Sequence, residues 1–183
     1  MNNNVRKLIF SSVIAALYVA MTTIFLPISF QEFQFRIAEV LAILPYFFPV
    51  AVPGLFVGCL IANIFSPFGF ADMLVGSLAT LFASLITMRL GKSAGNETIA
   101  NKALACLPPV VINAVFIGAL IAYFMVGAGE ADTFWTAFAL NALQVGFGQL
   151  VVIYVLGLPL MIYLPATGVI DRLKDIYESN VDE

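Results

Sequence analysis

The sequence of 183 residues contains no histidine, and only 10% of its residues are Asp, Glu, Lys or Arg. Without histidine, the chain lacks the commonest general base and the imidazole ligand of zinc and haem sites. The two cysteines, Cys59 and Cys106, lie far apart inside apolar runs, where a thiol is usually a small packed side chain. A formal net charge of −3 offers no basic surface to nucleic acid. We therefore expect no metal, no cofactor, no nucleic acid partner and no enzymatic activity.

Apolar residues dominate what is present. They make up 62% of the chain, and the mean hydropathy is +1.02. A soluble domain is closer to half apolar and a quarter charged, so a soluble core in a chain of this length cannot hide so much apolar surface. The composition predicts an all-α integral membrane protein in which the whole chain forms one membrane domain, with most of its surface facing lipid.

The apolar runs are long enough for several membrane spans, each of which needs about 20 residues. The stretch 37–66 is apolar but contains Pro45, Pro49 and Pro53, and one straight helix through three prolines would leave backbone groups unpaired in lipid. Two short segments fit that stretch better. The last run is longer than one span, and we expect it to kink near Gly157 and Pro159. The predicted segments are 8–26, 37–48, 53–65, 72–89, 104–126 and 134–164.

The positions of Lys and Arg test this count, because cytoplasmic loops carry an excess of positive charge. With six segments and both termini in the cytoplasm, only Arg36 faces the exterior. If 37–66 were a single span, the loop that carries Arg89, Lys92 and Lys102 would lie outside. The rule therefore favours six. The residues then expected inside are Arg6, Lys7, Arg89, Lys92, Lys102, Arg172 and Lys174.

Polar residues inside a membrane are costly and are therefore candidates for function. The richest group runs from Gln31 to Glu39, from the first loop into the second segment. Arg36 and Glu39 are three residues apart and would share a helix face. One interpretation is an ion pair that anchors the end of the helix. The other is a ligand lid, in which Phe33 and Phe35 stack on a flat ring while Gln34, Arg36 and Glu39 bond its edge.

Further polar residues fall in the outer halves of later segments, where a pocket open to the exterior would lie. Asp72 either caps its helix or contacts a ligand. The others either bond between helices or join the same pocket, except Gln149, which lies deeper and which we interpret as structural. The candidates are Asn63, Asp72, Asn113, Asn141 and Gln144.

Small residues recur at every fourth position on two segments. Ser12, Ala16 and Ala20 form such a stripe on the first, and Gly54, Gly58 and Ala62 form one on the third. Stripes of this kind let helix backbones approach closely. They indicate where a neighbouring helix or a partner protein could dock.

Seven short runs resemble those of the QueT family, whose members are predicted substrate-binding (S) components of energy-coupling-factor (ECF) importers for queuosine precursors, and the resemblance covers roughly residues 8–164. The resemblance rests on PISF at 27–30, QFRIAE at 34–39, LPYFFP at 44–49, PGLFVGCLIAN at 53–63, GSLAT at 76–80, LPP at 107–109 and GLPL at 157–160.

The resemblance implies a six-helix S-component bundle in a prokaryotic plasma membrane, with outer loops that enclose one small molecule. It also implies a transmembrane coupling subunit and two ATPases as partners. S components meet the coupling subunit through an Ala-x-x-x-Ala motif, which Ala16 and Ala20 match, with Ser12 one turn earlier. The implied substrate is a 7-deazaguanine such as preQ0 or preQ1, or a related salvage compound.

Such a ligand is planar, with N–H donors on a guanidine-like edge and a carbonyl acceptor. Glu39 could accept from that edge, while Gln34 or Arg36 serves the carbonyl. The candidate stacking faces are Phe33, Phe35 and Trp135. If the substrate carries an aminomethyl cation, Asp72 or Glu130 could neutralise it.

Other functions stay open at the level of the sequence. The ligand could be another vitamin or a purine-like compound, since S components share composition and topology. A solitary secondary transporter would be expected to show inverted repeats and an ion site near the midplane, and the uneven segments show neither.

Overall fold

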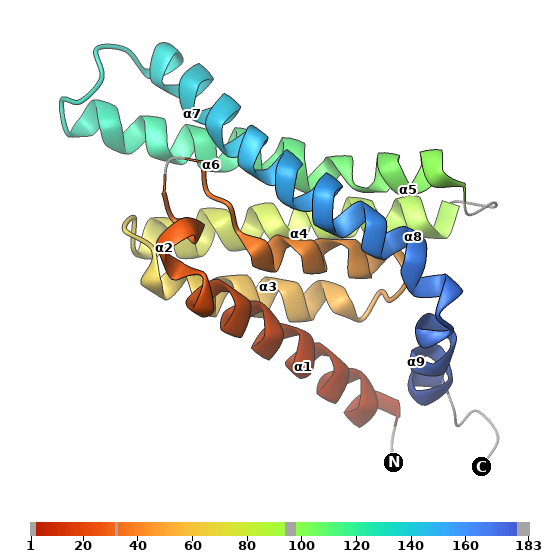
Figure 1. Ribbon diagram of the computed structural model, residues 1–183. Coiled ribbons are helices and arrows are strands. Elements are labelled where there is room, and N and C mark those ends of the chain that lie inside the picture. The colour runs from red at the N-terminus through yellow and green to blue at the C-terminus, as the bar shows by residue number, and fades with distance from the viewer. Residues whose placement is uncertain (1–2, 32, 94–97, 179–183) are drawn as a thin grey trace.

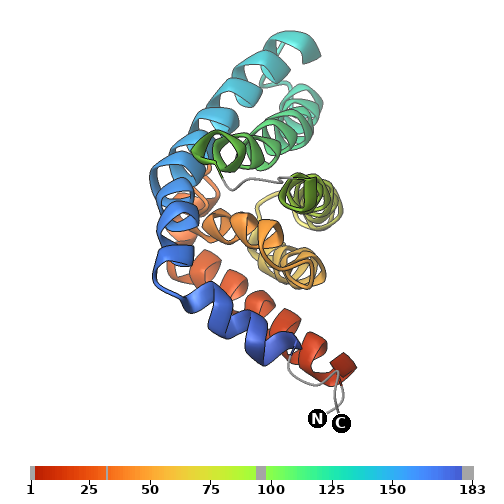
Figure 2. The same ribbon diagram turned by 90° about the vertical axis from the view of Figure 1, so that its right-hand side faces the viewer.

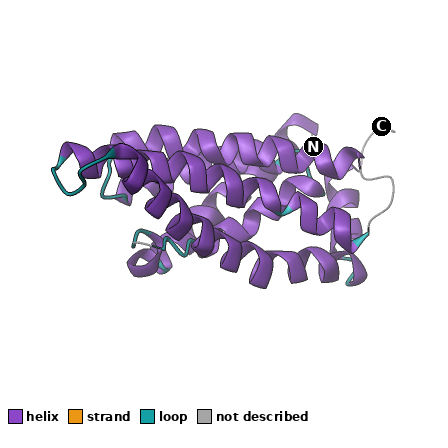
Figure 3. Cartoon of the chain, turned by 90° about the horizontal axis from the view of Figure 1, so that it is seen from above, coloured by secondary structure: helices purple, strands orange, loops and turns teal. Residues whose placement is uncertain are grey.

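The computed structural model describes residues 3–31, 33–93 and 98–178, and these form helices without any strand (Figure 3). The elements in chain order are α1 (Asn3–Ile24), α2 (Leu26–Ser29), η1 (Ile37–Tyr46), α3 (Ala51–Ala62), η2 (Asn63–Phe65), α4 (Phe70–Ser93), α5 (Ile99–Ala105), α6 (Leu107–Gly127), α7 (Phe134–Leu150), η3 (Val151–Gly157), α8 (Leu158–Ala166) and α9 (Val169–Glu178).

Within the described residues, four helical stretches are long and apolar enough to cross a membrane: 4–24, 70–93, 99–127 and 134–166. The proline-rich stretch forms two shorter apolar helices, η1 and α3, with Phe47–Val50 between them. All-helical structure and apolar spans therefore agree with the composition, since lipid leaves only helices or closed barrels to satisfy the backbone.

Different segments of the chain lie at the two ends of the bundle. Both termini lie at one end, and α2 and the loops after η2 and α6 lie at the opposite end, here called the distal end (Figure 1). Seen along the bundle, α9 lies beside α1 near the termini (Figure 2). Arg6 of α1 fixes this contact, because its Nη1 donates to the backbone oxygen of Ile176 at 3.1 Å.

A 3-10 helix, η1, occupies the centre of the bundle between α1, α4 and η3 (Figure 1). It is longer than the three or four residues usual for this helix type. Ala38, Ala42 and Ile43 on it are at most 3% exposed and belong to the main apolar core. This burial holds Glu39 inside the protein, although the sequence places it near a loop.

Close helix packing on both sides of the bundle depends on glycine. On α3, a Cβ at Gly54 would lie 2.6 Å from the Ser11 oxygen, and one at Gly58 would lie 2.9 Å from the Tyr18 Cβ. On α6, a Cβ at Gly118 would lie 2.7 Å from the Ala142 Cα of α7. The predicted stripe on the third segment thus faces α1 directly.

The structure divides two predicted segments further. A short helix, α5, precedes α6, and the stretch 134–166 changes register through a π-helical turn, η3, just before Pro159. Proline has no N–H to continue the ordinary ladder, and a π turn absorbs the mismatch. The amphipathic α9 falls in the tail, for which the sequence analysis predicted no helix.

Candidate functional site

Six buried polar side chains from five parts of the chain make up what we call the polar core. Each is at most 2% exposed, in a bundle whose interior is mostly apolar. Burying this many polar groups is costly unless they pair with one another or with a ligand. The polar core consists of Tyr18 on α1, Arg36 and Glu39 at the start of η1, Asn63 at the end of α3, Asp72 on α4 and Asn113 on α6.

Two hydrogen-bonded chains organise the polar core. The Tyr18 hydroxyl donates to Glu39 Oε1 at 2.5 Å. Arg36 Nη2 donates to Asn63 Oδ1, and Asn63 Nδ2 donates in turn to the backbone oxygen of Asp72 at 2.9 Å. The Arg36 guanidinium also lies over the Phe30 ring, 5.0 Å from its centroid, a distance typical of a cation–π contact.

Charge in the polar core is unbalanced. Arg36 is its one cation, and the charges of both Glu39 and Asp72 act on the guanidinium. Both carboxylate oxygens of Asp72 lack a hydrogen-bond partner, as does Arg36 Nε. Asn113 lies beside Glu39, yet its Nδ2 also makes no hydrogen bond of standard geometry. The polar core therefore has unused donors and acceptors buried away from solvent.

Asp72 does not cap its helix. It is the third residue of α4, and its carboxylate accepts no backbone N–H. Gly76, one turn later, leaves the space that this side chain uses: a Cβ there would lie 2.9 Å from Asp72 Oδ1 and 2.5 Å from Asn63 Nδ2. Of the two interpretations offered by the sequence, capping is therefore wrong.

The described residues of segment 30–36, which leave out residue 32, lead from α2 at the distal end to η1 and the polar core (Figure 1). Gln34 is 3% exposed and has φ +44°, a left-handed conformation that side chains other than glycine seldom adopt. The Phe33 backbone oxygen packs against Gly148 of α7, where a Cβ would collide with it. Phe33 itself stacks on Phe35 with centroids 6.0 Å apart and meets the Phe147 ring edge-on.

Three predicted site residues lie apart from the polar core. Trp135 is 75% exposed at the start of α7 and packs on its neighbours Phe134 and Phe138. Asn141 is buried but donates to Ala137 and to the sulfur of Met125, so it joins α7 to α6. Gln144 is half-buried on α7. Helical periodicity predicts that residues share a face, but it does not say which neighbour that face meets.

Glu130 is exposed in the loop between α6 and α7. Its backbone N–H bonds to Met125, and its side chain lies outside the polar core. Of the two acidic residues that could neutralise an amine, only Asp72 is buried with Arg36.

Sequence reasoning missed Tyr18, Cys59 and Thr80. Tyr18 bonds Glu39 directly, and the Cys59 sulfur accepts from Thr80 at 3.2 Å and from Asn63 at 3.5 Å. A tyrosine among many aromatics in an apolar helix gives no sequence signal of its own. Tyr18 lies one turn beyond Ala15, on the face of α1 that packs against Gly58, and this position predicts a buried side chain.

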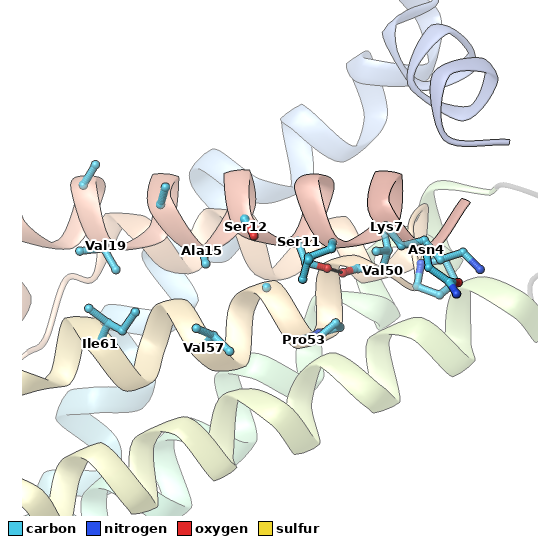
Figure 4. A pocket seen from close by; sticks show the side chains of 15 residues that line it. Asn4, Lys7, Ser11, Ser12, Ala15, Val19, Val50, Pro53, Val57 and Ile61 are labelled. Carbon is cyan, nitrogen blue, oxygen red and sulfur yellow. Dashed lines mark hydrogen bonds between the residues drawn. The ribbon is translucent and has the colours of Figure 1, made fainter. Parts of the chain in front are cut away.

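A groove of about 1080 Å³ runs between α1 and α3, and the predicted partner-binding residues Ser12, Ala16 and Ala20 line it (Figure 4). All three are exposed, whereas Ser11 and Ala15 contact α3. Ser11 donates to the Val50 backbone oxygen at 2.8 Å, so it joins α1 to the residue that precedes α3. The small residues on α1 thus serve two purposes, helix packing on one side and an open groove on the other.

A bundle of apolar helices around a buried polar core defines a helical membrane protein with an intramembrane polar site. The QueT transporter family model matches residues 8–166, and the chain belongs to this family. The resemblance carried by the sequence motifs is therefore confirmed, and with it a role as a transporter component. No curated protein and no solved structure matched the chain.

Proposed function

We propose that this chain is the substrate-capture subunit of an ECF importer and that it binds a 7-deazaguanine queuosine precursor in the polar core. The observation that carries the proposal is the polar core itself. It places one guanidinium, two carboxylates and two amides, several of them unpaired, inside an apolar bundle. Ionisable residues retained within a membrane are usually functional.

The chemistry of the polar core suits a flat, guanine-like ring. The Glu39 carboxylate accepts from Tyr18 and lies beside Asn113, and it is the acceptor that the N–H donors of the guanidine-like edge would need. Arg36 Nε is an unused donor that suits a ring carbonyl or nitrogen. Phe33 and Phe35 on segment 30–36 supply aromatic faces beside them.

The distribution of Lys and Arg supports an orientation in which the polar core faces the exterior half of the membrane. Seven of the eight Lys and Arg residues belong to the end of the bundle that holds the termini, and the positive-inside rule makes that end cytoplasmic. The distal end of the bundle would then face the exterior. The chain has no phosphate-binding loop of its own in the sequence, so a coupling subunit with two ATPases would supply the energy.

Calorimetric titration of the purified protein with preQ0, preQ1 and queuine tests the ligand class. We expect saturable 1:1 binding of at least one 7-deazaguanine and none of riboflavin, whose edge lacks the guanidine-like donors. Binding of an unrelated vitamin instead would leave an S component with a different ligand. Uptake by the chain alone in liposomes would favour a solitary secondary transporter.

Glu39→Gln is expected to weaken 7-deazaguanine binding by roughly 1–3 kcal/mol, because a charge-assisted hydrogen bond becomes a neutral one. Calorimetry on the folded variant measures this loss. Thr23→Ala is the matched control, since Thr23 bonds only within α1 and lies outside the polar core. Unchanged affinity in Glu39→Gln would remove Glu39 from the site.

The groove between α1 and α3 is the expected docking surface for the coupling subunit. Ala16→Phe fills this groove and is expected to lower recovery of the coupling subunit in co-purification by about tenfold, a change of about 1.4 kcal/mol. Leu17→Phe is the control, because the neighbouring Leu17 is 48% exposed but does not line the groove. Equal recovery with both variants would place the docking surface elsewhere.

A further inference from the structure

A second, smaller pocket lies at the end of the bundle that holds the termini, where α9 packs (Figure 1). Its volume is about 250 Å³, and its walls come from three separate parts of the chain. Drug-sized ligands usually occupy pockets of about 300–1,000 Å³, so this pocket suits a smaller group. The residues that matter here are Pro45, Phe47 and Pro49 around the turn from η1 to α3, Gly91 and Lys92 at the end of α4, and Lys174 on α9.

Close contacts hold the walls of this pocket in place. A Cβ at Gly91 would collide with the backbone oxygen of Tyr46, so α4 lies directly against the end of η1. On the other side, α9 is anchored twice. Ile170 is 3% exposed within the main apolar core, and Arg6 of α1 donates to the backbone oxygen of Ile176. The pocket is therefore formed before any ligand arrives.

Two lysines from different helices meet at this pocket without an anion between them. No acidic residue is among its described lining residues, because Asp171 and Asp175 of α9 are exposed and do not line it. Within the described part of the chain, neither Lys92 nor Lys174 has a hydrogen-bond or ion-pair partner. The carbonyl end of α4 offers Lys92 about half a negative charge at most. An anion between the two ammonium groups would remove their mutual repulsion.

The pocket lies at the depth where lipid phosphates are found. The apolar span on α4 covers residues 70–93, so Lys92 is in its last turn. The headgroup region of a bilayer begins where such apolar spans end. The apolar lining residues on the bundle side suit the glycerol and first acyl carbons of a lipid. Lys92 is exposed and Lys174 is half-buried, so a headgroup can reach both.

We propose that this pocket binds the phosphate of an anionic phospholipid, which bridges Lys92 and Lys174 and ties α9 to α4. A phosphatidylglycerol headgroup brings one negative charge and no cation. A zwitterionic headgroup would add a third positive charge beside the two lysines, so the pocket selects against it. Basic pockets between membrane helices recognise anionic headgroups in this way. The inference does not depend on which ligand the polar core binds.

Native mass spectrometry of the full-length protein in a nonionic detergent, titrated with phosphatidylglycerol or phosphatidylcholine, tests this site. The wild-type protein is expected to bind the first lipid at least about tenfold more tightly. Each lysine near an anionic lipid contributes about fivefold, so Lys92→Gln/Lys174→Gln should lower the affinity for phosphatidylglycerol by about 25-fold. Arg89→Gln/Arg172→Gln is the matched control, because it removes two exposed cations that do not line the pocket, and it should cost at most about twofold.

Each other outcome contradicts a defined part of the proposal. Equal affinity of the wild-type protein for the two lipids would show that the pocket does not select an anionic headgroup. Equal losses in the two double variants would show a diffuse attraction of anionic lipid to the basic end of the bundle. Displacement of the lipid by millimolar inorganic phosphate would assign the pocket to a free anion. If the double variant fails to fold, Lys92→Gln alone, at an exposed position, should lower the affinity about fivefold, and an unchanged affinity would overturn the site.

Discussion

Arg36→Met is expected to lower the free energy of unfolding of the ligand-free protein by about 3–5 kcal/mol, the cost of leaving buried charge without its compensating partner. Arg36 is 1% exposed and is the one cation of the polar core, where it lies near Glu39 and Asp72. Its loss leaves two buried carboxylates without compensation. For a chain of this size, the change corresponds to a fall in Tm of roughly 10 °C, which thermal unfolding in detergent measures.

Two comparisons make this result specific. Arg89→Gln removes an exposed arginine of α4 and should leave Tm unchanged. The double variant Arg36→Met/Asp72→Asn removes one of the uncompensated charges, so it should be more stable than Arg36→Met alone. A Tm for Arg36→Met equal to that of the wild type would show that the guanidinium does not hold the two carboxylates.

Gly148→Val is expected to weaken ligand binding by about 3 kcal/mol, on the order of 100-fold. The Phe33 backbone oxygen occupies the position that any side chain at Gly148 would need. A backbone group cannot move aside as a flexible side chain can, so segment 30–36 must shift as a whole. The shift would carry both Gln34 and Arg36 away from their present positions. Calorimetry with the preferred 7-deazaguanine measures the loss.

Gly127→Val is the matched control for this variant. A Cβ at Gly127, at the end of α6, meets nothing within 4 Å. Gly127→Val makes the same Gly-to-Val change in the adjacent helix without touching segment 30–36. If Gly148→Val bound the ligand with wild-type affinity, segment 30–36 would not form part of the site.

Much of the architecture could be predicted from the sequence because lipid imposes few solutions. Long apolar runs in a poorly charged chain must be helical, and three prolines must divide the stretch 37–66. Asn63 and Asp72 could be placed near each other because a short loop joins their helices. The three-residue spacing of Arg36 and Glu39 predicted that the two residues lie near each other, and the Glu39 backbone N–H donates to the Arg36 backbone oxygen at 2.9 Å.

The partners of these residues depended on the packing of distant helices. Tyr18 reaches Glu39 only because Gly58 lets α3 approach α1 and η1 lies between them and α4. Trp135 and Asn141 fall on faces of α7 that meet solvent or α6 instead of the polar core. The left-handed Gln34 and the π-helical η3 are local conformations that tertiary contacts impose against ordinary preference.

Photo-crosslinking with a diazirine-bearing 7-deazaguanine, followed by peptide mapping of the adducts, tests most directly whether the polar core binds the ligand. The account predicts labelling at Tyr18, at residues 34–39 and around Asp72, and loss of this labelling when excess unmodified ligand competes. Competed labelling confined to the groove between α1 and α3, or to the exposed start of α7, would contradict it.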